Sequence, residues 1–246
     1  MDKILIIPDV HGRDFWKTAK EKINEVDLVI FLGDYLDPYP HEGISKQRTI
    51  DNFKEILDFK LNNKDKVILL IGNHDLHYWP EFAQSWGCRR DDYNFNKIST
   101  MFLKNIEHFQ LSYMYDRYLF THAGVLDNWL KVINGEKNVR YTPFLNLEKQ
   151  ITLNNLNDLL FDNIAALWMI SEERGGRDVY GSCLWADVHE HLYETLIPNV
   201  YQVFGHTMTY PTITSEYIGP HFAMLDAQSC YTLHLESGEF IKETSC

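Results

Sequence analysis

Five stretches of the sequence place carboxylate, amide or imidazole side chains directly after an apolar run. In chain order they are Asp9 and His11 after ILIIP, Asp34 and Asp37 after LVIFLG, Asn73 and His74 after VILLIG, His122 after YLFT, and His206 after VYQVFG. These residue types suit borderline divalent ions such as Mn²⁺, Fe²⁺ and Zn²⁺, whereas a structural zinc site more often uses cysteine. A carboxylate can bridge two such ions roughly 3.5 to 4 Å apart, and the two ions can activate a water and hold a phosphate during an in-line displacement. The pattern therefore predicts a metal site with hydrolytic chemistry.

Each of these residues taken alone has a simpler explanation. An aspartate after a strand is more often a turn residue or a helix N-cap, and most of the eleven histidines must be exposed or hydrogen-bonded. The coincidence of polar residues at five strand ends favours ligation. The remaining histidines follow no such pattern and need no role in the chemistry: His41, His77, His108, His189, His191, His221 and His234.

The apolar runs predict the strands that position these side chains. Residues 4–7, 28–32 and 67–71 are rich in Ile, Leu and Val, as expected of strands buried on both faces. Residues 14–25 and 46–61, between them, have the spacing of amphipathic helices. The apolar side of the second helix comprises Ile50, Phe53, Ile56, Leu57 and Leu61. Alternating strands and helices indicate a parallel sheet, and because ligands bind beyond the carboxyl ends of its strands, we expect the five groups to converge.

The rest of the chain is predicted to complete one domain over residues 1–246. Residues 118–121 and 200–204 read as further strands, residues 154–171 as a mostly buried helix, and residues 222–240 as a closing antiparallel pair that turns at Ser237-Gly238. The polar and aromatic segments near 76–100 and 124–153 lack a clear period, which indicates insertions that cover the site.

Composition limits the possible partners and the compartment. With 45% hydrophobic and 14% aromatic residues, the chain of 246 residues can bury a substantial core. The net charge of −12 and the absence of a basic tract argue against nucleic acid or an anionic membrane as a partner. No segment is long enough to span a bilayer, and the four cysteines are widely spaced without a C-x-x-C motif. These features favour a reducing cytoplasm.

Taken as an ordered set, the motifs resemble those of the calcineurin-like metallophosphoesterases. They are D-V-H-G at 9–12, G-D-Y-L-D at 33–37, G-N-H-D at 72–75, T-H-A-G at 121–124 and G-H-T at 205–207. Within this family the chain most resembles the bacterial phosphoprotein phosphatase branch, which includes the symmetrical diadenosine tetraphosphatases. The segments that resemble those of the branch are G-D-x-x-D, SCLWAD at 182–187 and the closing hairpin. The resemblance implies a four-layer α/β sandwich of two packed mixed β-sheets flanked by helices.

The resemblance also implies roles for individual residues. Asp9 and His11 would hold one metal ion, Asp34 would bridge, and Asn73, His122 and His206 would hold the other ion. Mn²⁺ is the first choice, with Fe or Zn²⁺ as alternatives. A metal-bound hydroxide would attack phosphorus while His74 protonates the leaving oxygen, and Asp37 would pair with His74. We interpret Asp75 as a supporting carboxylate.

The chain departs from the family pattern in two places. The branch usually continues G-D-x-x-D-R-G, with the arginine gripping the phosphate, but Pro38-Tyr39 stands here. Arg174 and Arg177 are the candidate phosphate-binding residues, and Arg89 and Arg90 are alternatives to them. The histidine that often ends the family's G-H-x-H motif is Met208 in this chain.

Several functions remain open at this level. The favoured one is a phosphatase acting on phosphomonoesters, similar to serine/threonine protein phosphatases. The phosphorylated substrate could be a phosphoprotein, a nucleotide such as a dinucleoside polyphosphate, or a small phosphoester. The aromatic residues Trp79, Trp86, Tyr93 and Phe95 could stack on a base or ring. A different class of function is a metal-binding scaffold or regulatory protein that has lost turnover.

Overall fold

The computed structural model describes residues 1–80, 83–84, 88–140, 147, 149–162, 164–207 and 216–243. The chain divides into two compact units. Unit 1 comprises Met1–Phe109 and Ala227–Cys246, and unit 2 comprises Gln110–Asp226. Each unit is built around one β-sheet.

The sheet of unit 1 is mixed, with strand order β11-β10-β1-β2-β3-β4. The strands are β1 (Lys3–Ile7), β2 (Leu28–Phe31), β3 (Val67–Leu70), β4 (Phe109–Gln110), β10 (Tyr231–His234) and β11 (Glu239–Lys242). β1, β2 and β3 are parallel, and Ile7 pairs with Phe31, which pairs with Leu69. Their carboxyl ends therefore lie at the same edge of the sheet. β10 and β11 form the predicted antiparallel pair that turns at Ser237-Gly238. The prediction is wrong for residues 222–224, which belong to the sheet of unit 2.

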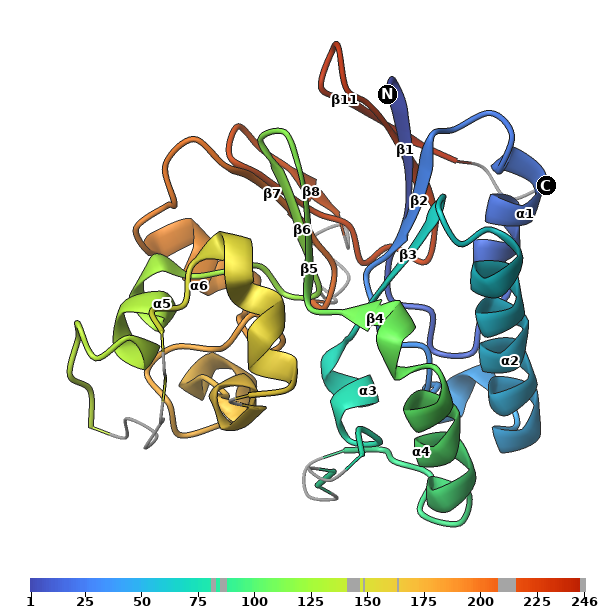
Figure 1. Cartoon of the computed structure of the whole chain (residues 1–246), viewed down its shortest axis with the longest axis horizontal. Coiled ribbons are helices and arrows are strands. Elements are labelled where there is room, and N and C mark those ends of the chain that lie inside the picture. Colours follow the sequence, from blue (N-terminus) through green and yellow to red (C-terminus); the bar gives the residue numbers. More distant parts are fainter. Residues whose placement is uncertain are drawn as a thin grey trace. The chain divides into compact units, whose positions relative to one another are not determined.

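The helical segments of unit 1 flank this sheet (Figure 1). They are η1 (Phe15–Lys17), α1 (Thr18–Lys22), η2 (Pro40–Glu42), α2 (Lys46–Asn62), α3 (Asn73–Leu76), α4 (Phe95–Lys104) and η3 (Ile106–His108). α2 begins after Ser45, whose Oγ accepts a hydrogen bond from the backbone N–H of Arg48 at 3.1 Å. The predicted apolar side of α2 is buried at four of its five positions. The prediction is wrong at Leu61, which is 39% exposed in the last turn, where α2 ends.

The sheet of unit 2 has the strand order β5-β6-β7-β9-β8. Its strands are β5 (Ser112–Tyr115), β6 (Tyr118–Thr121), β7 (Tyr201–Phe204), β8 (Tyr217–Ile218) and β9 (Phe222–Met224). β6, β7 and β9 are parallel. The helices are α5 (Asp127–Ile133) and α6 (Val188–Tyr193), and α6 packs Val188 against Phe204 and Met224.

The predicted continuous helix over residues 154–171 is wrong. The structure has 3₁₀ segments η4 (Leu153–Leu160), η5 (Ile164–Trp168) and η6 (Glu172–Arg174), and η4 contains non-helical backbone at Asn155. The Oδ1 of Asn155 accepts the backbone N–H of Thr152, and the Oδ1 of Asn157 accepts those of Leu111 and Ser112. Such side-chain bonds compete with a continuous α-helix.

Two mixed β-sheets with flanking helices confirm the predicted fold class. In the described part of the chain, none of the helices is both long and apolar enough to cross a bilayer. The predicted insertion near 76–100 contains the first residues of α4 (Phe95–Lys104), and the insertion near 124–153 contains α5 (Asp127–Ile133). Parts of the two insertions lie outside the described residues: 81–82, 85–87, 141–146 and 148. The prediction of one domain over residues 1–246 stays a prediction.

Candidate metal centre

Three predicted ligands meet in the loops that follow β1 and β2. Asp9, His11 and Asp34 each offer a ligand atom, and these atoms lie within 4.8 Å of one another. All three residues are buried, with at most 4% of their surface exposed. The Nδ1 of His11 lies 2.7 Å from the backbone oxygen of Leu36, which can only accept a hydrogen bond. Nδ1 therefore carries the proton, and the lone pair is on Nε2, 3.4 Å from Asp34 Oδ2.

The electrostatics of this cluster fit a cation. Burial and the charges of His74 and Arg13 lower the pKa of His11 well below its usual value, so the ring is neutral, as ligation requires. Burial and the neighbouring Asp9 carboxylate raise the pKa of Asp34 well above its usual value. Two buried carboxylates next to a neutral imidazole are unfavourable without a positive charge, and a divalent ion would supply that charge. The residues present therefore fit the metal that the motifs imply.

The backbone at these loops adopts a rare conformation. His11, Asp34 and Asp37 have positive φ values of 46°, 53° and 59°. Non-glycine residues seldom adopt the left-handed region, and such residues occur frequently at functional sites. In unit 2, His206 has a φ of 69°. Four of the predicted site residues therefore have left-handed backbone.

Close contact between two loops explains the glycine that precedes Asn73. A Cβ atom built on Gly72 would lie 2.2 Å from Asp34 Oδ1, closer than any real contact. The loop after β3 therefore touches the side chain of Asp34, and only glycine fits there.

Asp75 holds these loops together. Its side chain is fully buried, and it accepts hydrogen bonds from the backbone N–H groups of Asp34, Tyr35 and Gly72 at 2.7, 3.0 and 2.9 Å. The prediction that Asp75 is a supporting carboxylate is confirmed.

His74 and Asp37 form the predicted pair next to the cluster. The Nδ1 of His74 lies 2.9 Å from Asp37 Oδ2, and the backbone N–H of His74 donates to Asp34 Oδ1 at 2.8 Å. Burial raises the pKa of Asp37 to about 6, and the Tyr78 hydroxyl, which donates to Asp37 Oδ1 at 2.6 Å, opposes that rise. The imidazole is thus oriented by a carboxylate that is itself held by a phenol. Asn73, the residue before His74, is the first residue of α3 and is buried.

In unit 2 the structure brings His122 and His206 together at the carboxyl ends of β6 and β7. The Nε2 of His122 lies 3.1 Å from the Nδ1 of His206, and both residues are buried. Two nitrogen ligands at about 2.0–2.1 Å from one ion lie roughly 3.0–3.4 Å apart. The pair therefore fits a single ion. That all five strand ends share one centre stays a prediction. The position after Thr207, Met208, lies outside the described residues.

The predicted phosphate-binding arginines lie in unit 2. Arg174 Nη1 is 3.3 Å from Asp187 Oδ2, and Arg177 is exposed. Their contact with phosphate stays a prediction. Of the aromatic residues proposed to stack on a ring, Trp79 is buried against Phe102, so that interpretation is wrong for Trp79. Trp86 lies outside the described residues.

Three contacts of the site were not predicted from the sequence. The Tyr78 hydroxyl donates to Asp37 Oδ1. The Nη1 of Arg13 donates to the backbone oxygen of Asp9 at 3.2 Å. The ring of Tyr39 lies 5.4 Å from the ring of His11. The sequence carried a signal for Arg13, which directly follows D-V-H-G, and for Tyr39, which stands at the departure from the family pattern.

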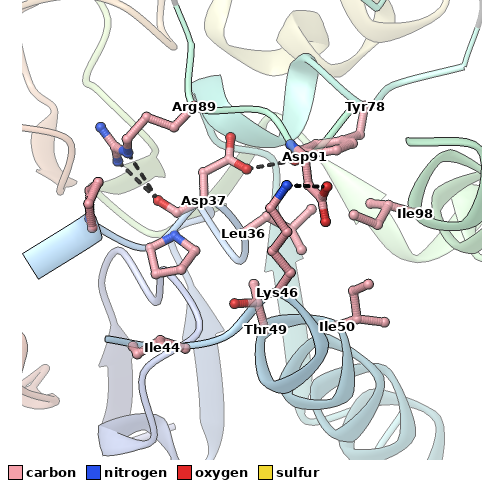
Figure 2. Close-up of a pocket in the computed structure, with 12 residues that line it drawn as sticks. Leu36, Asp37, Ile44, Lys46, Thr49, Ile50, Tyr78, Arg89, Asp91 and Ile98 are labelled. Atoms are coloured by element: carbon pink, nitrogen blue, oxygen red, sulfur yellow. Dashed lines mark hydrogen bonds and ion pairs between the residues drawn. The ribbon is translucent and has the colours of Figure 1, made fainter. Parts of the chain in front are cut away.

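A cavity of about 240 Å³ borders Asp37 (Figure 2). Apolar side chains line it from the loop after β2, from α2 and from α4: Leu36, Ile44, Ile50 and Ile98. Arg89 lines it as well, and Lys46 and Asp91 form an ion pair of 2.8 Å at its wall. Apolar surface therefore lies next to the His74–Asp37 pair.

Comparison with known families agrees with this geometry. The model of the calcineurin-like phosphoesterase family matches residues 2–210. The chain belongs to this family. As a calcineurin-like phosphoesterase, it is a metal-dependent hydrolase of phosphoester bonds.

Of three similar solved structures, one reaches a TM-score of 0.50. A protein serine/threonine phosphatase from Saccharomyces cerevisiae with similarity to human PP5 is 13% identical, with a TM-score of 0.50 over 99% of this chain and 79% of that chain. A metallophosphoesterase from Sphaerobacter thermophilus is 12% identical (TM-score 0.43, 99% and 89%), and the phosphoesterase Yfce from E. coli is 14% identical (TM-score 0.38, 99% and 98%). At 13% identity, the likeness to the yeast phosphatase concerns the fold alone. No curated protein sequence matches the chain significantly.

Proposed function

We propose that this calcineurin-like phosphoesterase is a phosphatase that hydrolyses phosphomonoesters, in the manner of the bacterial phosphoprotein phosphatase branch. The observation that carries the proposal is the buried Asp9–His11–Asp34 cluster directly beside the His74–Asp37 pair. A purely structural metal site would not need a histidine oriented by a buried carboxylate next to it.

The proposed ligand set divides between two divalent ions. Asp9 and His11 would hold one ion, Asp34 would bridge, and the other ion would be held by Asn73 with His122 and His206. Mn²⁺ is the proposed metal, since histidine, carboxylate and amide ligands suit it, and Fe or Zn²⁺ share these preferences. When bound, the ions supply an activated water and neutralise the phosphoryl oxygens.

The His74–Asp37 pair would supply the proton that the leaving group needs. Because Asp37 accepts from Nδ1 of His74, Nε2 is the ring nitrogen that would donate a proton to the leaving oxygen. Tyr78 stabilises the carboxylate form of Asp37 through its hydrogen bond, which keeps the partner of His74 an acceptor. The pair thus places a proton donor beside the cluster.

A cytoplasmic location belongs to the same proposal. It is supported by Cys88, Cys183 and Cys230, which are free cysteines within the described part of the chain.

The test is hydrolysis of p-nitrophenyl phosphate and bis-p-nitrophenyl phosphate by metal-stripped protein resupplied with Mn²⁺. We expect Mn²⁺-dependent turnover that favours the monoester and falls by about 10²- to 10⁴-fold in His74→Ala, because general acid catalysis contributes on that order. His221→Ala, which replaces an exposed histidine of unit 2 that is not among the strand-end residues, is the control and should keep turnover. Preference for the diester or for a dinucleoside polyphosphate would redirect the substrate assignment. Tight Mn²⁺ binding without cleavage of any ester would support the scaffold.

A further inference from the structure

We propose that Arg89 binds the phosphoryl group of the substrate beside the Asp9–His11–Asp34 cluster, and that Tyr39 positions its guanidinium. This inference rests on the proposed function, because it concerns the same substrate. Arg89 lies far along the chain from the loop after β2 that it contacts, and the sequence offered it, together with Arg90, only as an alternative to Arg174 and Arg177.

The guanidinium of Arg89 is fixed on the loop that carries Asp37 (Figure 2). Its Nε and Nη2 donate to the backbone oxygen of Asp37 at 3.3 and 3.0 Å. Its Cζ lies 3.9 Å from the centre of the Tyr39 ring. A carbonyl and an aromatic face hold the group in place by hydrogen bonds and cation–π attraction, and neither carries a negative charge to neutralise it.

Arg89 differs in this respect from the other arginines of unit 1. Arg13 pairs with Glu42 at 2.6 Å, Arg48 with Glu55 at 2.8 Å and Arg90 with Asp92 at 2.7 Å. No carboxylate of the described residues pairs with Arg89, which is exposed. Its positive charge is therefore available to an anion from solution.

The hydrogen-bonding capacity of Arg89 is also partly unused. A guanidinium has five N–H groups, and the Asp37 carbonyl takes one on Nε and one on Nη2. The other Nη2 hydrogen and both Nη1 hydrogens make no hydrogen bond to the described residues. A planar set of this kind matches phosphate oxygens, which favour bidentate contacts with arginine.

Arg89 lies within electrostatic reach of the predicted metal ligands. The Tyr39 ring on which it stacks is 5.4 Å from the His11 ring. Asp37, whose carbonyl Arg89 contacts, pairs through its side chain with His74, and the backbone N–H of His74 donates to Asp34 Oδ1 at 2.8 Å. A phosphate that contacts Arg89 would therefore also be near the cluster.

The neighbouring positions explain why a distant arginine is needed. Pro38 directly follows Asp37 and provides no charge, so the loop itself has no cation at this point. Tyr39 provides the flat surface on which a cation from another segment can rest. Arg89 also lines the cavity beside Asp37, so open space adjoins its side chain.

The experiment uses Mn²⁺-loaded full-length protein and the variants Arg89→Gln, Arg89→Lys, Tyr39→Leu and Tyr39→Phe, with Arg48→Ala as the matched control. Three quantities are measured for each: bound Mn²⁺ per chain, the Kd of inorganic phosphate by calorimetry, and kcat/KM for p-nitrophenyl phosphate. Glutamine can still donate to the Asp37 carbonyl but has no charge, so it separates the phosphate contact from the support of the loop.

We expect Arg89→Gln to bind phosphate roughly 10- to 100-fold more weakly, as for loss of a charge-assisted hydrogen bond. Its kcat/KM should fall by at least as much, with unchanged Mn²⁺ content, and Arg89→Lys should be intermediate. Tyr39→Leu should weaken phosphate binding several-fold, whereas Tyr39→Phe keeps the ring and should restore it. Arg48→Ala should resemble the wild type in phosphate binding and turnover, because Arg48 pairs with Glu55.

Phosphate affinity in Arg89→Gln equal to that of the wild type would overturn the inference, and so would loss of Mn²⁺, which would make Arg89 a support of the metal loop. If the wild type cleaves no ester, the proposed function fails, but the phosphate Kd still decides the role of Arg89. Wild-type protein that binds no phosphate would refute both.

Discussion

Asp75 illustrates how a single residue outside the ligand set can determine the geometry of the site. It is fully buried and accepts three backbone N–H groups, including that of Asp34 itself. A buried carboxylate at this position is favourable because those donors would otherwise lack partners. The G-N-H-D motif therefore combines two candidate site residues with one residue that shapes the loop around them.

Replacing Asp75 with Asn should weaken both the fold and metal binding. The amide has one acceptor oxygen and places an NH₂ group against backbone donors, so we expect a loss of about 1–3 kcal/mol in the free energy of unfolding. Mn²⁺ affinity should fall roughly 10- to 100-fold, as for residues that orient metal ligands. Urea denaturation and Mn²⁺ titration measure the two effects.

Asp58→Asn is the matched control for this prediction, since Asp58 is exposed on α2. It should change stability by less than about 0.5 kcal/mol. An Asp75→Asn protein with wild-type stability and Mn²⁺ affinity would contradict the role assigned to Asp75.

At the scale of elements, the parallel strands and the second helix could be predicted because their signals are local. Apolar runs gave β1, β2, β3, β6 and β7 to within one residue at either end. The periodicity of residues 46–61 gave α2, which the structure extends to Lys46–Asn62. The first predicted helix, 14–25, is shorter in the structure, with η1 (Phe15–Lys17) followed by α1 (Thr18–Lys22).

The other features of the fold and the site depend on contacts between segments that are far apart in the sequence. Periodicity could not predict these contacts, because it reports only local structure. Asn157 bonds to the backbone at Leu111 and Ser112, which contributes to breaking the expected helix. Arg89 donates a hydrogen bond to the backbone oxygen of Asp37, which lies 52 residues earlier in the sequence. The motifs located the candidate ligands, but the partners that orient them, such as Tyr78, become apparent only in the folded chain.

The docking of α2 on the sheet should depend on Phe53. Its ring is fully buried and stacks on Tyr35 at 5.3 Å, with Phe102 of α4 at 4.9 Å. Phe53→Ala should lower the free energy of unfolding by about 3–5 kcal/mol, because it removes an aromatic side chain and leaves a cavity. Chemical denaturation of the metal-free protein measures this loss.

Lys54→Ala provides the control from the same helix, because Lys54 is half exposed and its ion pair with Asp51 lies on the surface. Its effect should stay below about 0.5 kcal/mol. A loss of similar size in both variants would mean that α2 is not anchored through Phe53.

At the scale of the whole molecule, the charge of the chain explains why metal ions should matter for stability as well as for chemistry. The net charge is −12, and buried carboxylates contribute to it at the Asp9–His11–Asp34 cluster. Two divalent ions would offset part of this repulsion in the folded state, whereas the unfolded chain has no preformed site.

Mn²⁺ should therefore stabilise the protein against unfolding in a concentration-dependent way. For a site that exists only in the folded state, a free concentration of about 100 times Kd adds roughly 2.7 kcal/mol to the free energy of unfolding. Thermal unfolding of metal-stripped protein at increasing Mn²⁺ measures the shift in Tm. Ca²⁺ is the comparison ion, because it prefers an all-oxygen shell and should stabilise less where histidines are ligands.

Variants of the two units distinguish specific binding from a general effect of cations on an acidic surface. Asp9→Asn in unit 1 and His206→Ala in unit 2 should each reduce the Mn²⁺-dependent rise in Tm, whereas Asp58→Asn should not. Stabilisation by Ca²⁺ equal to that by Mn²⁺, unchanged in all three variants, would mean that the ions act on surface charge, and the proposed ligand set would then be wrong.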